Sequence, residues 1–328
     1  MIPSPANLTT RPPLLRAAAL SVHFPGPSGP VRAVDGITLD VRENETLALV
    51  GESGCGKSTL ARALVGLQPP TAGTVLFEGH ELGPLGSRAR DARCRDIQMI
   101  FQDPDASLNP RLTLEASIAE PLILHERFNS KQRVRRVCDL MAQVGLAPSM
   151  RNRYPHELSG GQRQRVCIAR ALAVRPRLIV CDEAVSALDV SVQAQILNLL
   201  KDLQREFGLT YLFITHDLGV VRYMADRIAV MYLGQIVETG SAGDVLDHST
   251  HPYTESLLAA VPSRDPLGHK KRIRLLGDVP SPAHPPSGCR FHTRCPKAFA
   301  RCSQEMPQLY PVSSGESRCF LNEAPKDA

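Results

Sequence analysis

The stretch GESGCGKST at Gly51–Thr59 fits the pattern G-x-x-x-x-G-K-[ST]. It follows the apolar run LALV, which predicts a strand, and from Ser58 onward the apolar residues of STLARALVGL recur at helical spacing. Glycines allow such a loop to curl so that its backbone N–H groups point at phosphate oxygens, and the following helix directs its positive N-terminal end to the same place. The order of strand, glycine-rich loop and helix therefore predicts an α/β fold with a site for a nucleoside triphosphate.

The residue types of this stretch, called the phosphate loop below, predict separate roles. Lys57 is expected to place a positive charge on the β- and γ-phosphates, and the hydroxyl of Ser58 to bind Mg²⁺. The other loop residues expected to contact the nucleotide are Gly51, Ser53, Gly54, Cys55, Gly56 and Thr59. A glycine-rich turn with no ligand is the alternative, which the position between a strand and a helix disfavours.

Two acidic residues follow a dense apolar run further along the chain. In RLIVCDE, Leu178–Cys181 predict a buried parallel strand, and Asp182 and Glu183 come at its carboxyl end, where open α/β sheets bind ligands. Asp182 is expected to hold Mg²⁺ through the water shell of the metal. Glu183 is expected to orient and deprotonate the attacking water. An acidic pair after a strand is a weak signal alone, and the phosphate loop upstream strengthens it.

A second glycine-rich helix start precedes this strand, in LSGGQRQR at Leu158–Arg165. Ser159, Gly160 and Gly161 are expected to open a helix whose N-terminus binds an anion, with Gln162 in its first turn. One chain has no use for two γ-phosphate sites unless they serve different nucleotides. A capped glycine-rich helix without a ligand is the alternative.

The segment LSGGQRQR resembles the signature of the ABC (ATP-binding cassette) ATPases, and the similarity to this family covers residues 15–245. The resemblance implies a P-loop NTPase cassette at 14–245, with an antiparallel β subdomain and a helical subdomain at about 103–175. It also implies that two cassettes pair head to tail, so that the phosphate loop of one and the signature of the other enclose each ATP. Residues 1–13, rich in Pro and Thr, are expected to be disordered.

The resemblance implies roles for four further residues. Gln102 in FQDP is expected to contact Mg²⁺ and water and to link the site to a membrane partner. Asp189 at the end of SALD is expected to lie at the interface between cassettes, and His216 in ITH to contact the γ-phosphate. Phe24 matches the aromatic residue that stacks on adenine, although a place in the core is an equal alternative.

Three longer segments are similar to the oligopeptide/dipeptide importer ATPases: FQDPDASLNPR, DEAVSALDVSVQAQIL and HPYTESLLAAVP. SALDVSVQAQ is similar to the second of the two paralogous ATPases of these systems. The chain departs from the family at Ala184, where proline is usual, but this change removes no ligand. The resemblance implies ATP hydrolysis that powers the import of di- and oligopeptides. An ATPase of a nickel or glutathione importer, or a soluble ABC ATPase not coupled to transport, is the alternative.

The same resemblance implies the partners. They are a second cassette, expected to be a paralogue, two membrane permease subunits and an extracytoplasmic solute-binding protein. The segment 103–127 is expected to form the groove for the permease. No uninterrupted apolar stretch is long enough to span a bilayer, and prolines and an arginine interrupt the N-terminus where a signal peptide would be apolar. The chain is therefore expected at the cytoplasmic face of the membrane, as a peripheral subunit.

The composition argues against a nucleic-acid partner. The net charge is only +5, and lysines and arginines are spread among acidic residues instead of forming a stripe. There is no Trp, and aromatic residues make up 5% of the chain, which disfavours a surface that stacks on bases.

Four of the nine cysteines gather near the end of the chain, in a C-terminal region expected at 246–328. Cys289, Cys295, Cys302 and Cys319 have the spacing C-x5-C-x6-C-x16-C. A cytosolic location disfavours disulfides, and structural zinc usually takes more closely spaced pairs. Four thiolates can hold a [4Fe–4S] cluster, which the resemblance also implies, with His292 expected to be no ligand. Four free cysteines remain the alternative.

Overall fold

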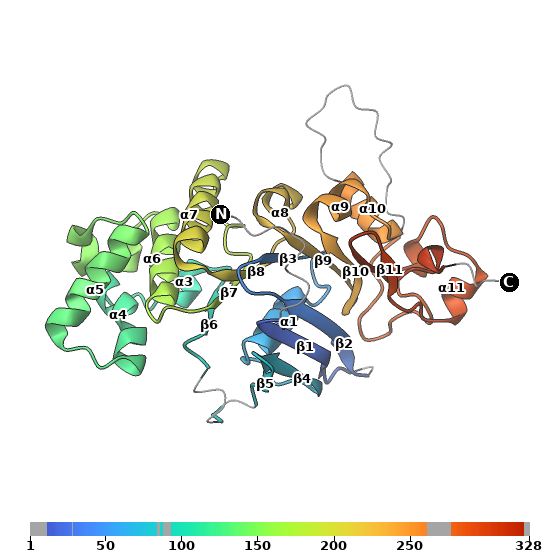
Figure 1. The fold of residues 1–328 in the computed structure, drawn as a ribbon, viewed down its shortest axis with the longest axis horizontal. Coiled ribbons are helices and arrows are strands. Elements are labelled where there is room, and N and C mark those ends of the chain that lie inside the picture. Colours follow the sequence, from blue (N-terminus) through green and yellow to red (C-terminus); the bar gives the residue numbers. More distant parts are fainter. Residues whose placement is uncertain (1–11, 28, 84–85, 88–92, 261–276, 325–328) are drawn as a thin grey trace, which may run out of the picture. The chain divides into compact units, whose positions relative to one another are not determined.

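The computed structural model describes residues 12–27, 29–83, 86–87, 93–260 and 277–324. The chain divides into two compact units (Figure 1), which are residues 1–82 with 215–328 and residues 83–214. The first unit holds the phosphate loop and the cysteine-rich C-terminal region, and the second holds Asp182, Glu183 and the signature segment. The disorder expected of residues 1–13 falls almost entirely outside the described residues.

The first unit contains a small antiparallel sheet. Strand β1 (Leu15–Phe24) pairs with β2 (Val31–Val41) on one side and β4 (Ala72–Phe77) on the other, and β5 (His80–Glu81) pairs with β4. Irregularities in the register of β1 coincide with Ala19, which has a φ of 47°. Such breaks in the ladder bend a strand and increase its twist. This sheet is the antiparallel subdomain that the family resemblance implies.

A second set of strands in the first unit carries the phosphate loop. Strand β3 (Thr46–Val50) runs parallel to β9 (Arg227–Tyr232), and β10 (Gln235–Ser241) pairs antiparallel with β9. Two short strands of the C-terminal region, β12 (Gly315–Ser317) and β11 (Tyr310–Val312), continue the order beyond β10. The end of the chain is therefore built into the sheet that leads into the phosphate loop.

The first unit also contains helices, and three of them share one hydrophobic core with a residue of the C-terminal region. The helical elements are α1 (Lys57–Leu64), α8 (Leu218–Met224), α9 (Ala242–Asp247), α10 (Pro252–Ala259), α11 (Ala300–Gln304) and the 3-10 turns η4 (His292–Arg294) and η5 (Phe320–Asn322). Phe291, from the C-terminal region, lies in the same buried cluster as Val50, Val230 and Val245. Burial of these apolar side chains holds β3, β9, α8, α9, α10 and Phe291 together in one core.

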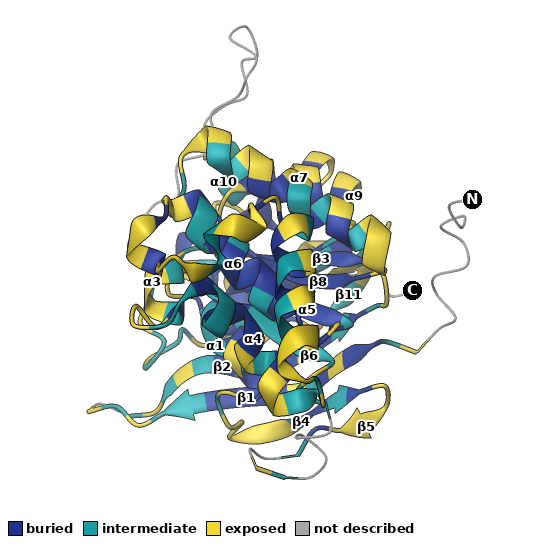
Figure 2. Ribbon diagram, turned by 90° about the vertical axis from the view of Figure 1, so that its left-hand side faces the viewer, coloured by how far each residue is buried: buried dark blue, intermediate teal, exposed yellow. Residues whose placement is uncertain are grey.

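The second unit contains three parallel strands, in the order β8-β7-β6: β6 (Ile97–Ile100), β7 (Leu178–Asp182) and β8 (Thr210–Ile214). Every residue of β7 and β8 is buried, and Figure 2 shows the continuous burial of β8. Continuous apolar runs are typical of parallel strands covered on both faces. The prediction of a buried parallel strand from RLIVCDE is confirmed.

The helices of the second unit begin at polar caps. They are α3 (Pro104–Ser107), α4 (Leu114–His125), α5 (Ser130–Gln143), α6 (Gly160–Leu172) and α7 (Val190–Phe207), with the 3-10 turns η2 (Pro148–Asn152) and η3 (Pro155–Glu157). Asn129 caps α5 and Ser159 caps α6, each accepting a hydrogen bond from a backbone N–H of the first turn. Both helices carry a capping box. In the part of the chain that is described, no helix combines the length and apolar character needed to cross a bilayer.

Candidate functional site

The phosphate loop curls around the side chain of its lysine. Strand β3 ends at Val50 and helix α1 begins at Lys57, with Gly56 at the N-cap in a left-handed conformation (φ 109°). The ammonium of Lys57 is buried and donates hydrogen bonds to the carbonyl oxygens of Gly51 at 2.8 Å and Glu52 at 2.9 Å. A positive charge therefore lies inside the curl of the loop, beside the positive end of α1.

Cys55 fills the base of this loop without offering a reactive thiolate. Its side chain is buried, and its Sγ lies 3.8 Å from the Lys57 ammonium. Burial raises the pKa of the Cys55 thiol, and the nearby Lys57 charge only partly offsets this. The thiol stays protonated at neutral pH, so its role in the loop is packing.

Two more candidate residues lie in the first unit at the ends of strands. His216 is exposed just before α8, and the preceding Thr215 donates its N–H to the carbonyl of Leu49 in β3 at 3.3 Å. This bond ties the segment of His216 to the strand that leads into the phosphate loop. Phe24 ends β1, opposite Val31 of β2, and is half-buried, which leaves part of its ring accessible.

The second unit brings Gln102 and Glu183 together. The amide nitrogen of Gln102 donates to a carboxylate oxygen of Glu183 at 3.0 Å, although the two residues are 81 positions apart in the sequence. Asp182 is the buried last residue of β7. Carboxylates and an amide therefore gather at the carboxyl ends of β6 and β7, the edge where parallel sheets carry their ligands.

Glu183 has an unusual backbone for a residue with a side chain. Its φ is 48°, in the left-handed region, and its N–H donates to the carbonyl of Ile214 at 3.0 Å. The next turn is closed by Ser186, whose hydroxyl donates to the Glu183 carbonyl at 2.9 Å. A non-glycine residue costs about 1–3 kcal/mol in such a conformation and keeps it only where its surroundings impose it. The sequence carries no signal for this strain, because glutamate does not favour it.

The signature segment opens α6 as expected. The Ser159 hydroxyl accepts from the N–H of Gln162 at 3.3 Å, while Ser159 and Gly160 remain exposed. Gly161 lies against α7, since a Cβ there would be 2.4 Å from a methyl group of Val192. Asp189 caps α7 and accepts from the Val192 N–H at 3.0 Å. The second unit thus places two exposed helix starts, at Ser159 and at Asp189, beside each other.

The four cysteines of the C-terminal region line one hollow. Its wall includes Cys289, Cys295, Cys302 and Cys319, together with His251, His292, Phe291, Phe299 and Phe320. Burial, and to a smaller degree the three other thiols, raises the pKa of Cys289 to about 11. A ring nitrogen of His292 lies 2.8 Å from the carbonyl oxygen of Cys289. Within the described residues, no group of three or more His, Cys, Asp or Glu side chains is arranged to hold a metal ion.

Sequence reasoning missed a set of residues that holds the phosphate loop from the C-terminal region. Tyr253 accepts a hydrogen bond from the backbone N–H of Glu52 at 2.9 Å, and Arg294 forms two hydrogen bonds with the Glu52 carboxylate. These partners are 201 and 242 positions from Glu52. No local pattern in one sequence reports contacts over such distances.

The chain is similar to curated peptide transport proteins over nearly its whole length. It is 52% identical over 309 residues to "Putative oligopeptide transport ATP-binding protein YkfD" of Bacillus subtilis, which covers 93% of this chain and 94% of the relative. It is 54% identical over 319 residues to "Oligopeptide transport ATP-binding protein OppF" of Salmonella typhimurium, covering 93% and 95%. The chain belongs to the ABC transporter ATP-binding proteins. The family model "ABC transporter" matches residues 34–186, and "Oligopeptide/dipeptide transporter, C-terminal region" matches residues 237–302.

A solved structure supports the same family for the cassette. The ABC cassette MJ0796, described as dimeric, in a post-hydrolysis state and bound to ADP and Pi, is 31% identical with a TM-score of 0.64. The match covers 70% of this ABC protein and 98% of that chain. The prediction of a P-loop NTPase cassette fold, and of membership of the ABC family, is confirmed.

Proposed function

We propose that this chain binds and hydrolyses ATP to power the import of di- and oligopeptides through a membrane transporter. The observation that carries the proposal is the similarity to oligopeptide transport ATP-binding proteins, which extends through the cassette and into the C-terminal region. The site geometry supports it, because the buried ammonium of Lys57 can bind phosphate, and the Glu183 carboxylate, held beside the Gln102 amide, can act as a base toward water.

The residues of the first unit would bind the nucleotide. Lys57 would exchange its bonds to the carbonyls of Gly51 and Glu52 for the β- and γ-phosphates, which are stronger acceptors because they are charged. Backbone N–H groups of the phosphate loop would hold the phosphates, Phe24 would stack on adenine, and His216 would contact the γ-phosphate.

The residues of the second unit would carry out hydrolysis. Glu183 would take a proton from the attacking water, and Gln102, already bonded to its carboxylate, would hold that water in place. For Mg²⁺ we keep the ligands expected from the sequence, which are the Ser58 hydroxyl of the first unit and the Gln102 amide and Asp182 carboxylate of the second, all oxygen donors of the kind that Mg²⁺ binds. The metal, when bound, would neutralise charge on the β- and γ-phosphates. Ser159, Gly160, Gly161, Gln162 and Asp189 would face the nucleotide of a second cassette.

The partners follow from the proposal. We expect a second cassette, a paralogue in preference to a second copy, with two permease subunits and an extracytoplasmic solute-binding protein. The chain would act at the cytoplasmic face of the membrane, with a permease docked near residues 103–127. We keep the domain limits expected from the sequence, a cassette at 14–245 and a C-terminal region at 246–328, as part of this proposal.

A pull-down combined with an uptake assay tests the function. A tagged chain isolated in mild detergent should bring down two multi-spanning proteins and a second cassette. Cells carrying only the Glu183→Gln variant should lose uptake of a labelled dipeptide, while Glu206→Gln, which changes an exposed carboxylate on α7, should keep it. A chain that purifies without membrane proteins would point to an ABC ATPase not coupled to transport. Uptake loss confined to nickel or glutathione would reassign the cargo.

We also propose that Cys289, Cys295, Cys302 and Cys319 hold a [4Fe–4S] cluster. The support is that these four side chains line one hollow, and four thiolates are the usual ligands of such a cluster. The cluster would supply crosslinks between segments of the C-terminal region.

Anaerobic purification should therefore yield about four irons and four sulfides per chain, with broad visible absorption. The Cys302→Ser variant should lose most of the iron, because Cys302 is the most buried of the four. The matched Cys138→Ser variant, on α5 of the other unit, should keep it. One zinc per chain, or no metal, would refute the cluster and leave the ATPase proposal intact.

A further inference from the structure

One ion pair joins the C-terminal region to the phosphate loop. The two guanidinium nitrogens Nη1 and Nη2 of Arg294 lie 2.9 Å and 3.1 Å from the two carboxylate oxygens of Glu52. The side chain of Arg294 is 6% exposed and that of Glu52 is 22% exposed. A bidentate ion pair of this kind fixes both the distance and the relative orientation of the guanidinium and the carboxylate. Because little of it is exposed, solvent and salt screen it only weakly.

The backbone of Glu52 is held from the same side. Its N–H donates to the hydroxyl of Tyr253 at 2.9 Å. Tyr253 packs against Tyr232 and Phe291, with ring centroids 4.6 Å and 5.4 Å away, and all three rings are buried. Arg294 also donates to the hydroxyl of Tyr232 at 3.4 Å. Glu52 is therefore fixed at its side chain and at its backbone by groups from the last third of the chain.

Glu52 links these contacts to the Lys57 ammonium, the group proposed to bind phosphate. The carbonyl of Glu52 accepts a hydrogen bond from the Lys57 ammonium, and the carbonyl of the adjacent Gly51 accepts another. A shift of Glu52 would displace both acceptors and with them the Lys57 charge. Arg294 itself touches neither Lys57 nor the loop glycines in any contact described, so it acts through Glu52.

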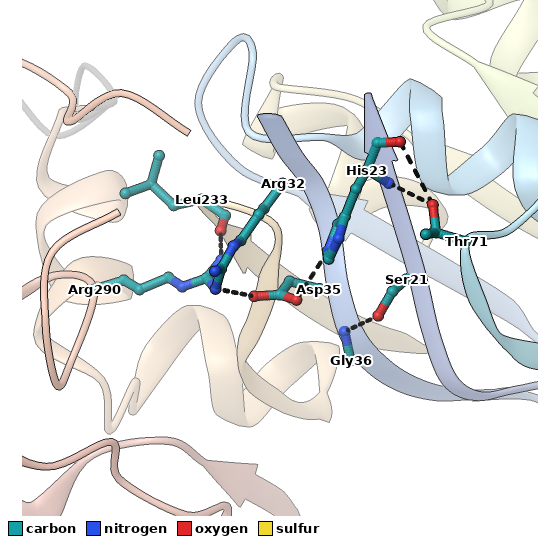
Figure 3. Close-up of polar contacts among 8 residues, drawn as sticks. All are labelled: Ser21, His23, Arg32, Asp35, Gly36, Thr71, Leu233 and Arg290. Atoms are coloured by element: carbon teal, nitrogen blue, oxygen red, sulfur yellow. Dashed lines mark hydrogen bonds and ion pairs between the residues drawn. The ribbon is translucent and has the colours of Figure 1, made fainter. Parts of the chain in front are cut away.

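A second arginine of the same segment contacts Asp35 on β2, the strand that pairs with β1 (Figure 3). Arg290 is buried and donates to the carbonyl of Leu233 and to the carboxylate of Asp35 on β2. Asp35 in turn lies 3.1 Å from Nε2 of His23, the neighbour of Phe24 on β1. Burial alone would raise the pKa of Asp35, but Arg290 and His23 outweigh it and lower that pKa. Asp35 thus remains a charged partner for Arg290 at neutral pH.

Both arginines lie between two of the cysteines. The order along the chain is Cys289, Arg290, Phe291, His292, Thr293, Arg294, Cys295. The backbone of Cys289 is tied to that of Cys302 by an N–H to carbonyl bond of 2.8 Å. Because Arg290 adjoins Cys289 and Arg294 adjoins Cys295, a displacement of either cysteine would pass directly to the backbone of the neighbouring arginine.

We infer that Arg294 is a positioning residue for the phosphate loop, and that through it the affinity for ATP depends on the state of the four cysteines. The inference rests on the proposed ATPase function and adds a regulatory connection to it. Arg290 provides the parallel connection to the strand that carries Phe24.

Nucleotide affinity tests the role of Arg294. In the full-length protein, Arg294→Gln should weaken the binding of a fluorescent ATP analogue by about tenfold or more, because it removes both hydrogen bonds from Arg294 to the half-buried Glu52 carboxylate. Arg294→Lys keeps the positive charge but loses the bidentate geometry, so its affinity for the ATP analogue should lie between those of Arg294→Gln and the wild type. The double variant Glu52→Gln/Arg294→Gln should bind no worse than Arg294→Gln, since both changes remove the same interaction.

The matched control is Arg301→Gln. Arg301 belongs to the same C-terminal region and pairs with Glu305 and Glu323, with no described contact to the phosphate loop. Its loss should leave ATP affinity unchanged even if the melting temperature falls. If Arg294→Gln keeps ATP affinity within twofold of the wild type, or if Arg301→Gln weakens it as much, the positioning role is refuted. If Arg294→Gln fails to fold, the ATP affinities of Arg294→Lys and Tyr253→Phe can be compared with that of Arg301→Gln instead.

The dependence on the cysteines needs a separate comparison. Cys295→Ser should weaken ATP binding in the wild-type background and weaken it much less in the Arg294→Gln background. Equal weakening in both backgrounds would mean that the cysteines do not act through Arg294. A wild-type chain that binds ATP tightly but supports no peptide uptake would refute the proposed transport function and leave this inference standing. A wild-type chain that binds no ATP would refute both.

Discussion

Replacing Glu183 with Gln is expected to lower the rate of ATP hydrolysis by about 10²- to 10⁴-fold, the range typical of losing a general base. The amide is nearly the same size as the carboxylate and can still accept a hydrogen bond from Gln102, which now reaches a Glu183 oxygen at 3.0 Å. The site would keep its shape and lose its base. ATP affinity should therefore remain within a few-fold of the wild type.

Phosphate release measured with saturating MgATP gives the rate, and size-exclusion chromatography shows what accumulates. The variant should trap a closed, ATP-bound pair of cassettes, because binding proceeds and the step that releases the pair does not. Glu206→Gln, at an exposed position on α7, is the matched carboxylate control and should hydrolyse ATP normally. Rapid multiple-turnover hydrolysis by Glu183→Gln would refute the role given to this residue.

Replacing Gly56 with Ala is expected to abolish ATP binding and to destabilise the first unit by about 3 kcal/mol or more. A Cβ at this position would lie 1.9 Å from the backbone carbonyl oxygen of Ala33 and 2.8 Å from the terminal methyl of Met231. The φ of 109° is also one that residues with side chains rarely adopt. Because the first clash is with backbone, only movement of the loop or of β2 could relieve it.

Gly54 provides the matched control two residues away. It also has a positive φ, 78°, but a Cβ there would meet nothing within 4 Å. Gly54→Ala should therefore cost only the strain of the left-handed backbone, about 1–2 kcal/mol. Thermal melts and a fluorescent ATP analogue separate the two variants. Similar losses in both would show that backbone strain, and not the close approach of β2, determines the requirement for glycine at position 56.

Much of the fold was predictable because its signals are local. The apolar run LALV predicts a strand, and it lies within β3. Ser159 opens α6 because a hydroxyl at the N-cap and a glutamine three residues on form a capping box.

The C-terminal region was harder to predict. Its strands β11 and β12 have three residues each, too few for a pattern of alternation to be recognised. They form because β12 pairs with β10, which is nearly 80 residues upstream, as the partners Glu238 and Ser317 show. The composition of this region suggests a loosely packed tail, whereas Phe291 lies in a core cluster with residues of β3 and β9.

The sequence predicts which residues belong to the candidate site, but not the contacts that hold those residues in place. Lys57, Asp182 and Glu183 stand out because chemistry fixes their types and their places after strands. The left-handed backbone of Glu183 and the hold of Arg294 on Glu52 depend on segments far away in the sequence. Tertiary packing imposes such features, and a single sequence carries no local record of them.

The hold of Arg294 on Glu52 has a consequence for how the protein is made. Arg294 is 242 residues later in the chain than Glu52, so a ribosome needs about 12 to 48 s between the two codons at 5–20 residues per second. Throughout that interval the nascent chain carries its phosphate loop without the arginine. Chains that end before Arg294 would lack the contact altogether. Such incomplete chains should therefore bind ATP more weakly than the finished protein, by about the tenfold expected for Arg294→Gln.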